Sequence, residues 1–300
     1  MTVDFRGVIP ALVTPFSGDG VDYPALRAHV GWLVEAGVNS VVACGTTGES
    51  PTLSHDEHDR VVAETVEAAA GRIPVLAGTG SNSTAEAISL SRHARQVGAA
   101  GLLLVSPYYN KPTQEGLYGH FVAIAESAGL PVILYNIPSR CGVNILPETL
   151  ARLAEHELII GVKEATGDLN QMIRTIELCG PDFLVTCGDD GLTLPLLAVG
   201  GGGVISVAAN IIPGPVIRMW KAWEAGRLAE ARASFYEMLP FFKSLFLETN
   251  PIPLKFLMGL TGRMSGQMRP PMGPPSAPVQ ERLRLVASEW ATHFPPRPQP

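Results

Sequence analysis

The chain has 300 residues, of which 46% are hydrophobic and 17% are charged, so it can bury a large core and is not an intrinsically disordered protein. Its net charge of -6 argues against a basic binding surface, and we expect neither nucleic acid nor an anionic membrane as a partner. Residues 1–4 lack the features of a signal peptide and no apolar run reaches the ~20 residues of a membrane span, so we expect a cytoplasmic protein.

Eight short apolar runs alternate with helical stretches over the first part of the chain. One helix is expected at 24–36, with Asp22 as its N-cap and Gly37 as its stop. Further helices are expected at 55–70, at 84–97 and from residue 147. Strands are expected at 7–14, 39–44, 73–78, 100–106, 131–135, 158–164, 183–187 and 203–207. This alternation predicts an α/β fold, a (β/α)8 TIM barrel.

A doubly wound parallel sheet is the alternative fold. Eight strand–helix units and the lack of a GxGxxG motif after the first strand count against it. The alternation stops at Gly226, and the Pro-rich stretch 268–278 must be a loop. We assign 1–226 to the barrel and 227–294 to a C-terminal helical segment packed on it, and we expect the tail 295–300 to be disordered. Helices are expected in this segment at 228–247, 253–260 and 278–290.

The strand at 158–164 carries Lys163 at its end, and it is the one lysine of five that ends an apolar strand run. Burial disfavours the charged form of an amine, so a lysine placed there becomes available as a nucleophile. The other interpretation is a lysine whose stem lies along the core while its ammonium reaches water.

In such a barrel the active site lies at the carboxyl ends of the strands. A phenol beside an amine can pass the protons that imine formation requires. The N–H groups and hydroxyls of a Gly-Thr-Thr-Gly turn suit a carboxylate, and an arginine can bind a second carboxylate. Each residue alone has an ordinary structural explanation, and their joint placement favours a site. The reactive residues at the predicted strand ends are Thr46, Thr47, Tyr108, Tyr109, Tyr135, Arg140 and Lys163.

Other catalytic and metal-binding patterns are missing. The four cysteines have no CxxC spacing, which indicates neither a zinc site nor a disulfide framework. His55-Asp56-Glu57-His58 has metal-ligand residue types, but it opens a helix whose N-terminus favours acidic residues without any metal. No G-x-S-x-G motif is present for a serine nucleophile. We predict no metal site.

Five motifs together resemble the dihydrodipicolinate synthase branch of the pyruvate-dependent class I aldolases. The match covers nearly the whole chain, in order and spacing. Arg140 after Tyr135, and Tyr-Tyr-Asn at 108–110, favour this branch over sialic-acid lyases and sugar-acid aldolases. The motifs are Gly45-Thr46-Thr47-Gly48-Glu49-Ser50, Pro107-Tyr108-Tyr109-Asn110, Tyr135-Asn136-Ile137-Pro138-Ser139-Arg140, Gly161-Val162-Lys163-Glu164-Ala165 and Asn250-Pro251-Ile252-Pro253.

The resemblance implies a lyase of lysine (diaminopimelate) biosynthesis that needs no cofactor. Lys163 would form a Schiff base with pyruvate, and the enamine would attack L-aspartate 4-semialdehyde to give, after cyclisation, 4-hydroxy-tetrahydrodipicolinate. The resemblance also implies a tight dimer, usually paired into a homotetramer. The implied proton relay is Tyr135, Thr46 and Tyr109 (from a neighbouring subunit), and the implied substrate-binding groups are Thr47, the backbone of Ile205, and Arg140.

The same resemblance implies a feedback site for L-lysine at the dimer interface. Glu86 suits an ammonium, and the imidazoles and Asn82 suit polar contacts. Pro51 departs from the small alanine expected there and removes a backbone N–H. The implied residues are Ser50, Pro51, His55, His58, Asn82, Glu86 and Tyr108.

Two other functions stay open from the sequence. One is a related aldolase acting on a sugar-derived 2-keto acid, which a preference for uncharged sugar aldehydes would favour. The other is a non-catalytic barrel that senses lysine or pyruvate, against which the joint presence of Lys163, Tyr135, Thr46 and Tyr109 argues.

Overall fold

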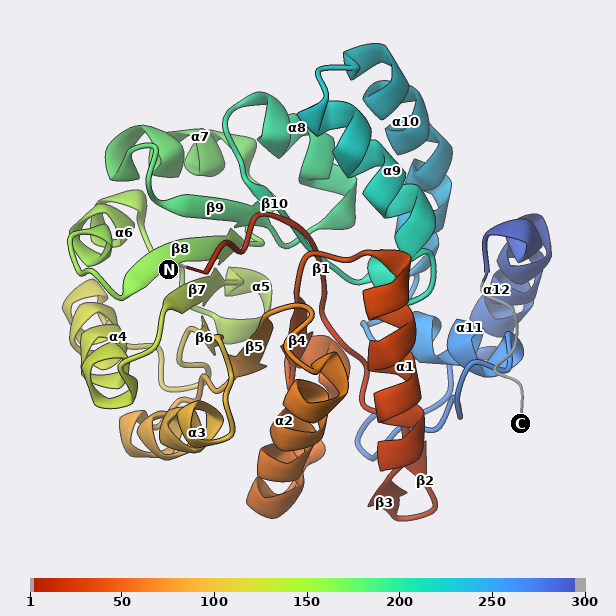
Figure 1. Ribbon diagram of the computed structural model, residues 1–300, viewed down its shortest axis with the longest axis horizontal. Coiled ribbons are helices and arrows are strands. Elements are labelled where there is room, and N and C mark those ends of the chain that lie inside the picture. Colours follow the sequence, from red (N-terminus) through yellow and green to blue (C-terminus); the bar gives the residue numbers. More distant parts are fainter. Residues whose placement is uncertain (1–2, 295–300) are drawn as a thin grey trace.

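The computed structural model describes residues 3–294, so the expected disordered tail at 295–300 lies outside the described residues. Eight parallel strands form a nearly closed barrel with a ring of helices around it (Figure 1), which confirms the predicted fold. The strands are β1 (Gly7–Pro10), β4 (Val41–Ala43), β5 (Val75–Gly78), β6 (Gly101–Val105), β7 (Val132–Asn136), β8 (Ile159–Glu164), β9 (Leu184–Cys187) and β10 (Gly203–Ser206). Their order is β1-β10-β9-β8-β7-β6-β5-β4, and an Ala11–Val42 bridge joins the two ends.

Helices follow the strands and cover the outside of the barrel. Asp22 accepts a hydrogen bond from the N–H of Ala25 at 3.0 Å, and Gly37 ends the first helix with φ 87°, as predicted. Ser54 and Glu57 form a reciprocal capping box at the start of the second. These helices are α1 (Tyr23–Ala36), α2 (His55–Ala69), α3 (Thr84–Gln96), α4 (Gln114–Ala128), α5 (Pro138–Cys141), α6 (Pro147–Ala154), α7 (Leu169–Cys179), α8 (Thr193–Ala198) and α9 (Pro213–Glu224).

The N-terminal half differs from the prediction in its first strand, in the segment after that strand, and in α4 and α5, where no helix was predicted. The first strand stops at Pro10 instead of residue 14, because the Asn210 side chain binds the C=O of Ala11 and the N–H of Val13 in place of a neighbouring strand. A two-stranded hairpin, β2 (Phe16–Ser17) and β3 (Gly20–Val21), follows.

Strand alternation divides the core into two layers. In β7, Val132 and Leu134 face the helices, whereas Ile133 and Tyr135 face the barrel interior. The interior layer is the smaller one and takes residues from β1, β4, β5, β6, β7 and β10, among them Ile205. The same alternation decides which side chains at the carboxyl ends of the strands face the barrel interior and which face the helices.

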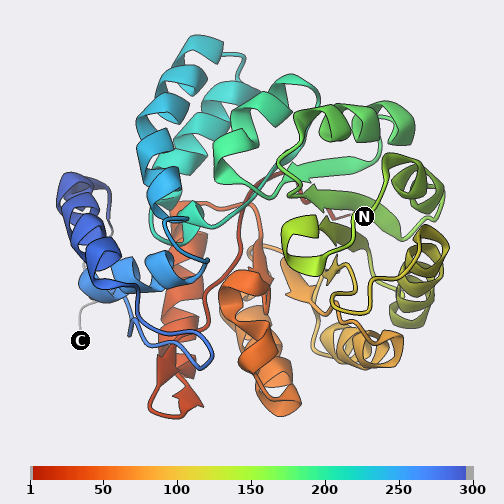
Figure 2. The ribbon, with the colours of Figure 1, turned by 180° about the vertical axis from the view of Figure 1, so that it is seen from behind.

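The chain ends in three helices, α10 (Leu228–Ser244), α11 (Ile252–Leu260) and α12 (Ala277–Glu289). Helix α10 packs on α9, and α11 lies beside α1 in both ribbon views (Figures 1 and 2). Helix α10 is three residues shorter than predicted. The Pro-rich stretch is a loop as expected up to Ser276, and its last two residues already belong to α12. One hydrophobic cluster joins these helices to the barrel, and the division of the chain at residue 226 stays a prediction.

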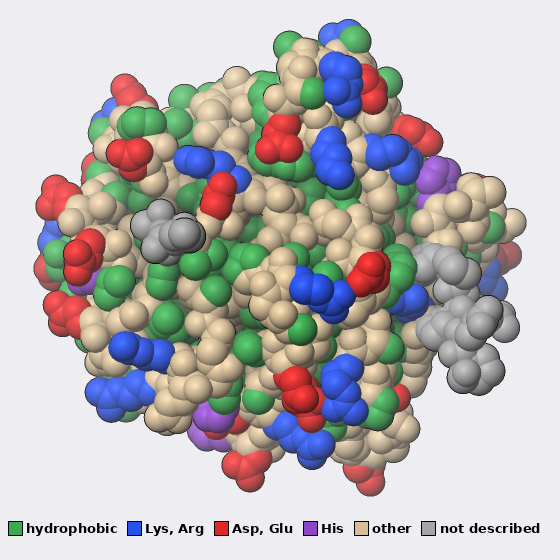
Figure 3. Space-filling view, viewed as in Figure 1, with side chains coloured by type: hydrophobic (Ala, Val, Ile, Leu, Met, Phe, Trp, Pro, Cys, Tyr) green, Lys and Arg blue, Asp and Glu red, His purple; other side chains and the backbone are tan. Residues whose placement is uncertain are grey.

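The described surface carries charges of both signs. Acidic and basic side chains are interspersed over the face in Figure 3. Within residues 3–294 no helix combines the length and apolarity needed to cross a membrane.

Candidate active site at the carboxyl ends of the strands

Lys163 points into the barrel near the end of β8. Its neighbour Val162 belongs to the outer layer, so the strand's alternation turns Lys163 inward. The Nζ atom lies 4.0 Å from the centroid of the Tyr135 ring, and Tyr135 is paired with Lys163 across β7 and β8. Both side chains are only 5% exposed. A buried primary amine beside a tyrosine is the arrangement that an imine-forming site requires.

Gly188, just after β9, leaves room for this lysine. A Cβ atom there would lie 3.1 Å from Lys163 Cε and 2.7 Å from Ala165 Cβ. Any larger residue would therefore displace the lysine stem or the strand that carries it.

Glu164, the next residue of β8, faces the helices instead of the barrel interior. It is fully buried and accepts hydrogen bonds from Asn136 Nδ2 at 3.2 Å, Thr166 N–H at 2.9 Å and Gln171 Nε2 at 3.4 Å. Burial raises the pKa of Glu164, and these hydrogen bonds act in the opposite direction. Glu164 thus lies on the opposite face of β8 from Lys163. Its hydrogen bonds join the end of β8 to Asn136 at the end of β7 and to Gln171 of α7.

The turn after β4 presents Thr46 and Thr47 from a short 3-10 segment, Thr46–Gly48. The N–H of Glu49 closes the turn on the C=O of Thr46 at 3.1 Å. Thr47 is 2% exposed, and its Oγ1 accepts a hydrogen bond of 3.0 Å from Asn250 Nδ2. The two threonines thus lie at the strand-end face, as the sequence predicts.

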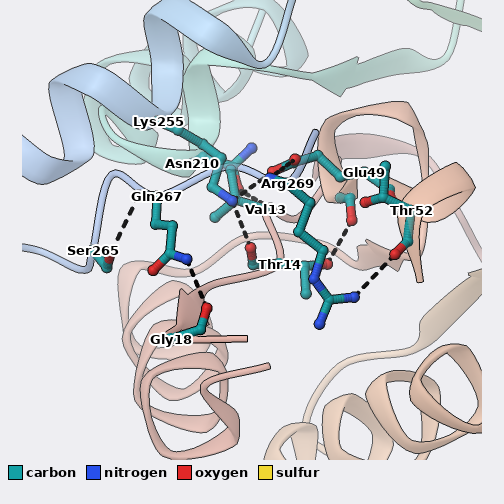
Figure 4. A network of polar contacts seen from close by, with 11 residues as sticks. Val13, Thr14, Gly18, Glu49, Thr52, Asn210, Lys255, Ser265, Gln267 and Arg269 are labelled. Carbon is teal, nitrogen blue, oxygen red and sulfur yellow. Dashed lines mark hydrogen bonds and ion pairs between the residues drawn. The ribbon is translucent and has the colours of Figure 1, made fainter. Parts of the chain in front are cut away.

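A buried ion pair anchors this turn to the C-terminal helices (Figure 4). Lys255 of α11 is fully buried, and its Nζ donates to the Glu49 carboxylate at 2.5 Å and to the C=O of Thr14 at 2.8 Å. The N–H of Arg269 donates to the second Glu49 oxygen at 3.2 Å, and its guanidinium binds both oxygens of Glu57 at 2.6 Å. The Arg269 hydrogen bonds lower the pKa of Glu57 to about 2.

Arg140 lies in the short helix α5, directly after β7. Its Nη2 donates to the backbone C=O of Asn250 at 3.0 Å. Asn250 therefore contacts both Thr47 and Arg140, which come from different βα units.

The end of β10 is fixed by a buried carboxylate. Ser206, which follows Ile205, donates its hydroxyl to Asp190 at 2.5 Å, and the N–H groups of Val207 and Ala208 donate to Asp190 at 3.0 Å each. Burial raises the pKa of Asp190 to about 6, although the three hydrogen bonds act to lower it. Ile205 itself is fully buried in the interior layer.

A cavity of about 430 Å³ opens beside this site. Thr46 and Arg140 line it, whereas Lys163 and Tyr135 do not. Asn82 does not line it either, but its Nδ2 donates to the C=O of Tyr108 at 3.2 Å. The cavity also collects most of the residues predicted for the lysine site: Ser50, Pro51, His55, His58, Glu86 and Tyr108.

Glu86 is the acidic centre of this cavity. Its carboxylate accepts from Ser81 Oγ and pairs with His55 Nε2 at 2.8 Å. The hydrogen bond from Ser81 lowers the pKa of Glu86 most, and the one from His55 lowers it further. Burial, and then the Glu86 charge, raise the pKa of the nearby Tyr108 phenol.

Tyr109 stands apart from the residues around Lys163. Its side chain is 91% exposed, and its backbone has φ 72°, which is unusual for a residue other than glycine. It thus projects away from the surface of its own chain.

Sequence reasoning missed several residues that the structure places at the site. Asn250 belongs to a motif that the resemblance rests on, but no role follows from its position in the sequence. Lys255 gave a signal that could have been used, because a lone charged residue on an otherwise apolar helix needs a partner. Gly188, Glu49 and Asp190 gave no comparable signal.

Comparison with known proteins gives a consistent result. A model described as the "Dihydrodipicolinate synthetase family" matches residues 4–289. A 4-hydroxy-tetrahydrodipicolinate synthase of Syntrophus aciditrophicus (strain SB) is 51% identical over 286 residues, which cover 95% of this chain and 98% of that protein. The crystal structure of dihydrodipicolinate synthase from Aquifex aeolicus matches with a TM-score of 0.95 and 44% identity, over 97% of this chain and 99% of that one. The enzyme from Cyanidioschyzon merolae, solved with lysine bound, matches with a TM-score of 0.92 and 42% identity, over 95% of this chain and 97% of that one.

Proposed function

Because the chain belongs to the dihydrodipicolinate synthetase family, we propose that it condenses pyruvate with L-aspartate 4-semialdehyde to form 4-hydroxy-tetrahydrodipicolinate. The reaction belongs to lysine biosynthesis and makes the chain a lyase. The observation that carries this function is the buried amine of Lys163, 4.0 Å from the centre of the Tyr135 ring.

The proposed chemistry begins with the neutral amine of Lys163. It attacks the keto carbon of pyruvate, the carbinolamine loses water to form the Schiff base, and loss of a methyl proton gives the enamine. The enamine carbon then attacks the aldehyde carbon of the second substrate. The amine of that substrate afterwards displaces Lys163 as the ring closes, which frees the enzyme without any cofactor.

Three hydroxyl groups are proposed to move the protons. Tyr135 lies against Lys163, and Thr46 lies on the turn after β4 at the same end of the barrel. Tyr109 is proposed to serve the site of another subunit, since it is 91% exposed on its own chain. This assignment requires a tight homodimer, and pairing of such dimers into a tetramer in the cytoplasm is part of the proposal.

Substrate binding is proposed to use donors aimed at carboxylates. Thr47 and the backbone at Ile205 would hold pyruvate, and Arg140 would hold the carboxylate of the semialdehyde. The fixed end of β10 and the anchored turn after β4 support this proposal, because both segments are held by buried carboxylates.

The direct test of the overall reaction is a coupled assay. Pyruvate and aspartate semialdehyde are supplied together, and formation of the cyclic product is followed through its reduction by an added reductase. We expect turnover that requires both substrates and no added metal. Turnover with an uncharged sugar aldehyde in preference to the semialdehyde would contradict the proposed substrate.

Replacing Arg140 by alanine should impair use of the semialdehyde more than formation of the Schiff base with pyruvate. We expect the KM for the semialdehyde to rise about 10- to 100-fold, because a charge-assisted carboxylate contact is lost. Half-saturation of Schiff-base formation by pyruvate should change less than about threefold. Arg152→Ala, which removes an arginine that pairs with Glu115 on the surface, is the matched control. An equal change in the KM for the semialdehyde and in half-saturation by pyruvate would contradict the role of Arg140.

L-Lysine is proposed as an inhibitor that binds the cavity around Glu86. A lysine-bound relative and the acidic centre of the cavity support this proposal. Glu86→Gln should weaken inhibition by lysine roughly tenfold, since one charged partner of an ammonium is removed. Activity without lysine should be retained. Glu35→Gln, which removes a surface carboxylate paired with Arg72, controls for loss of charge alone. Unchanged inhibition in the Glu86 variant would contradict the site.

A further inference from the structure

Asn250 lies between the two residues proposed to bind the two substrate carboxylates. Its side-chain Nδ2 donates to Thr47 Oγ1 at 3.0 Å, and its backbone C=O accepts from Arg140 Nη2 at 3.0 Å. Asn250 is 5% exposed and Thr47 is 2% exposed, so water competes little for the hydrogen bond between their side chains. One residue of the C-terminal segment thus contacts both halves of the substrate site.

The direction of the Thr47 hydrogen bond has a chemical consequence. A hydroxyl has one hydrogen to donate and lone pairs with which to accept. Because the amide of Asn250 donates to Thr47 Oγ1, the hydroxyl hydrogen cannot point at Asn250 and must point elsewhere. Within residues 3–294, this amide is the one hydrogen-bonding partner that the chain gives the hydroxyl. The hydrogen is therefore left for a ligand.

We propose that Asn250 is a positioning residue that aims the Thr47 hydroxyl at the carboxylate of pyruvate. This role rests on the proposed function, and no pattern in the sequence indicates it. Asn250 acts through Thr47 and does not itself contact the reacting atoms.

The surroundings hold Asn250 in place for this role. Helix α11 begins two residues later and carries Lys255, whose Nζ binds Glu49 at the end of the same turn that bears Thr47. The amide and the hydroxyl are thus fixed on two segments that a buried ion pair joins. Arg140 is held at the backbone of Asn250, so the side-chain amide can be changed without removing the Arg140 contact.

The test compares Asn250→Asp with Asn250→Ala. The aspartate is isosteric, but it only accepts, so it would take the Thr47 hydrogen and reverse the hydrogen bond. We expect the pyruvate concentration that half-saturates borohydride trapping to rise about 10- to 100-fold in N250D, and less in N250A. The KM for the semialdehyde should change by less than about threefold in N250A. A purely structural role predicts the opposite order, because the isosteric variant keeps the packing.

N250D also places a negative charge near the pyruvate carboxylate, and a failure of N250D to fold would leave its effect unmeasured. A second comparison therefore measures N250A in the wild-type protein and in a protein that carries Thr47→Val. If Asn250 acts through Thr47, then N250A should change pyruvate half-saturation less than about twofold once Thr47→Val is present. Two results would overturn the proposal. One is a rise in the half-saturating pyruvate concentration in N250D that does not exceed the rise in N250A. The other is an effect of N250A that is equally large when Thr47→Val is present. If the Asn250 amide were flipped, so that its oxygen accepted from the Thr47 hydroxyl, N250D would have no larger effect than N250A. Absence of any adduct in the wild-type protein would instead refute the proposed function.

Discussion

Replacing Lys163 by alanine is expected to lower kcat by at least about 10³-fold and to abolish trapping of pyruvate by borohydride. The amine is the group that becomes covalently joined to the substrate, and within residues 3–294 Lys163 is the one lysine whose Nζ lies against the Tyr135 ring. Steady-state turnover and the mass of the borohydride-treated protein measure the two effects. Lys163→Arg should be equally inactive, since it keeps the positive charge but not the nucleophile.

Lys255 provides an internal control for this experiment. It is also buried, but its Nζ is held by Glu49 and Thr14. A Lys255 variant that folds should therefore still form the pyruvate adduct. Substantial turnover by Lys163→Ala, or an adduct that survives this substitution, would contradict the assignment of the nucleophile.

Replacing Lys255 by methionine is expected to lower the free energy of unfolding by about 3–5 kcal/mol. The substitution leaves the Glu49 side chain, which is 1% exposed, without its cationic partner. Burial lowers the pKa of Lys255 although Glu49 acts to raise it, so the pair stabilises the fold less than removal of one partner destabilises it. Denaturant unfolding of the wild-type and variant proteins measures the loss.

The double variant Lys255→Met/Glu49→Gln should recover much of this loss, because no charge is then buried alone. Arg72→Met, which breaks the exposed pair with Glu35, should cost less than about 1 kcal/mol and serves as the surface control. A change of less than about 1 kcal/mol in Lys255→Met would show that the buried pair does not anchor the C-terminal segment.

The fold was predictable because each barrel strand is short, apolar and followed by a helix. The parts that differed depend on contacts that no local pattern contains. The first strand ends early because Asn210 binds its continuation, and Asn210 lies 199 residues away from Ala11. The short helix α5, which carries Arg140, lies in a segment where the sequence predicts no helix or strand.

The candidate site was predictable for residues that end strands. Strand alternation turns Lys163 and Tyr135 inward, and the barrel brings their ends together. The contacts of Asn250 with Thr47 and of Lys255 with Glu49 were not predictable, since they join residues 203 and 206 positions apart. The role of Tyr109 stays a prediction that depends on a second subunit.

Locating the covalent adduct tests most directly whether Lys163 is the nucleophile. The protein is incubated with pyruvate and borohydride, digested, and its peptides are analysed by mass spectrometry. We expect one reduced pyruvyl group per chain, on the peptide that contains Lys163, and none on the peptide that contains Lys255. A protein that turns over both substrates but carries the adduct on another lysine, or carries none, would contradict this expectation.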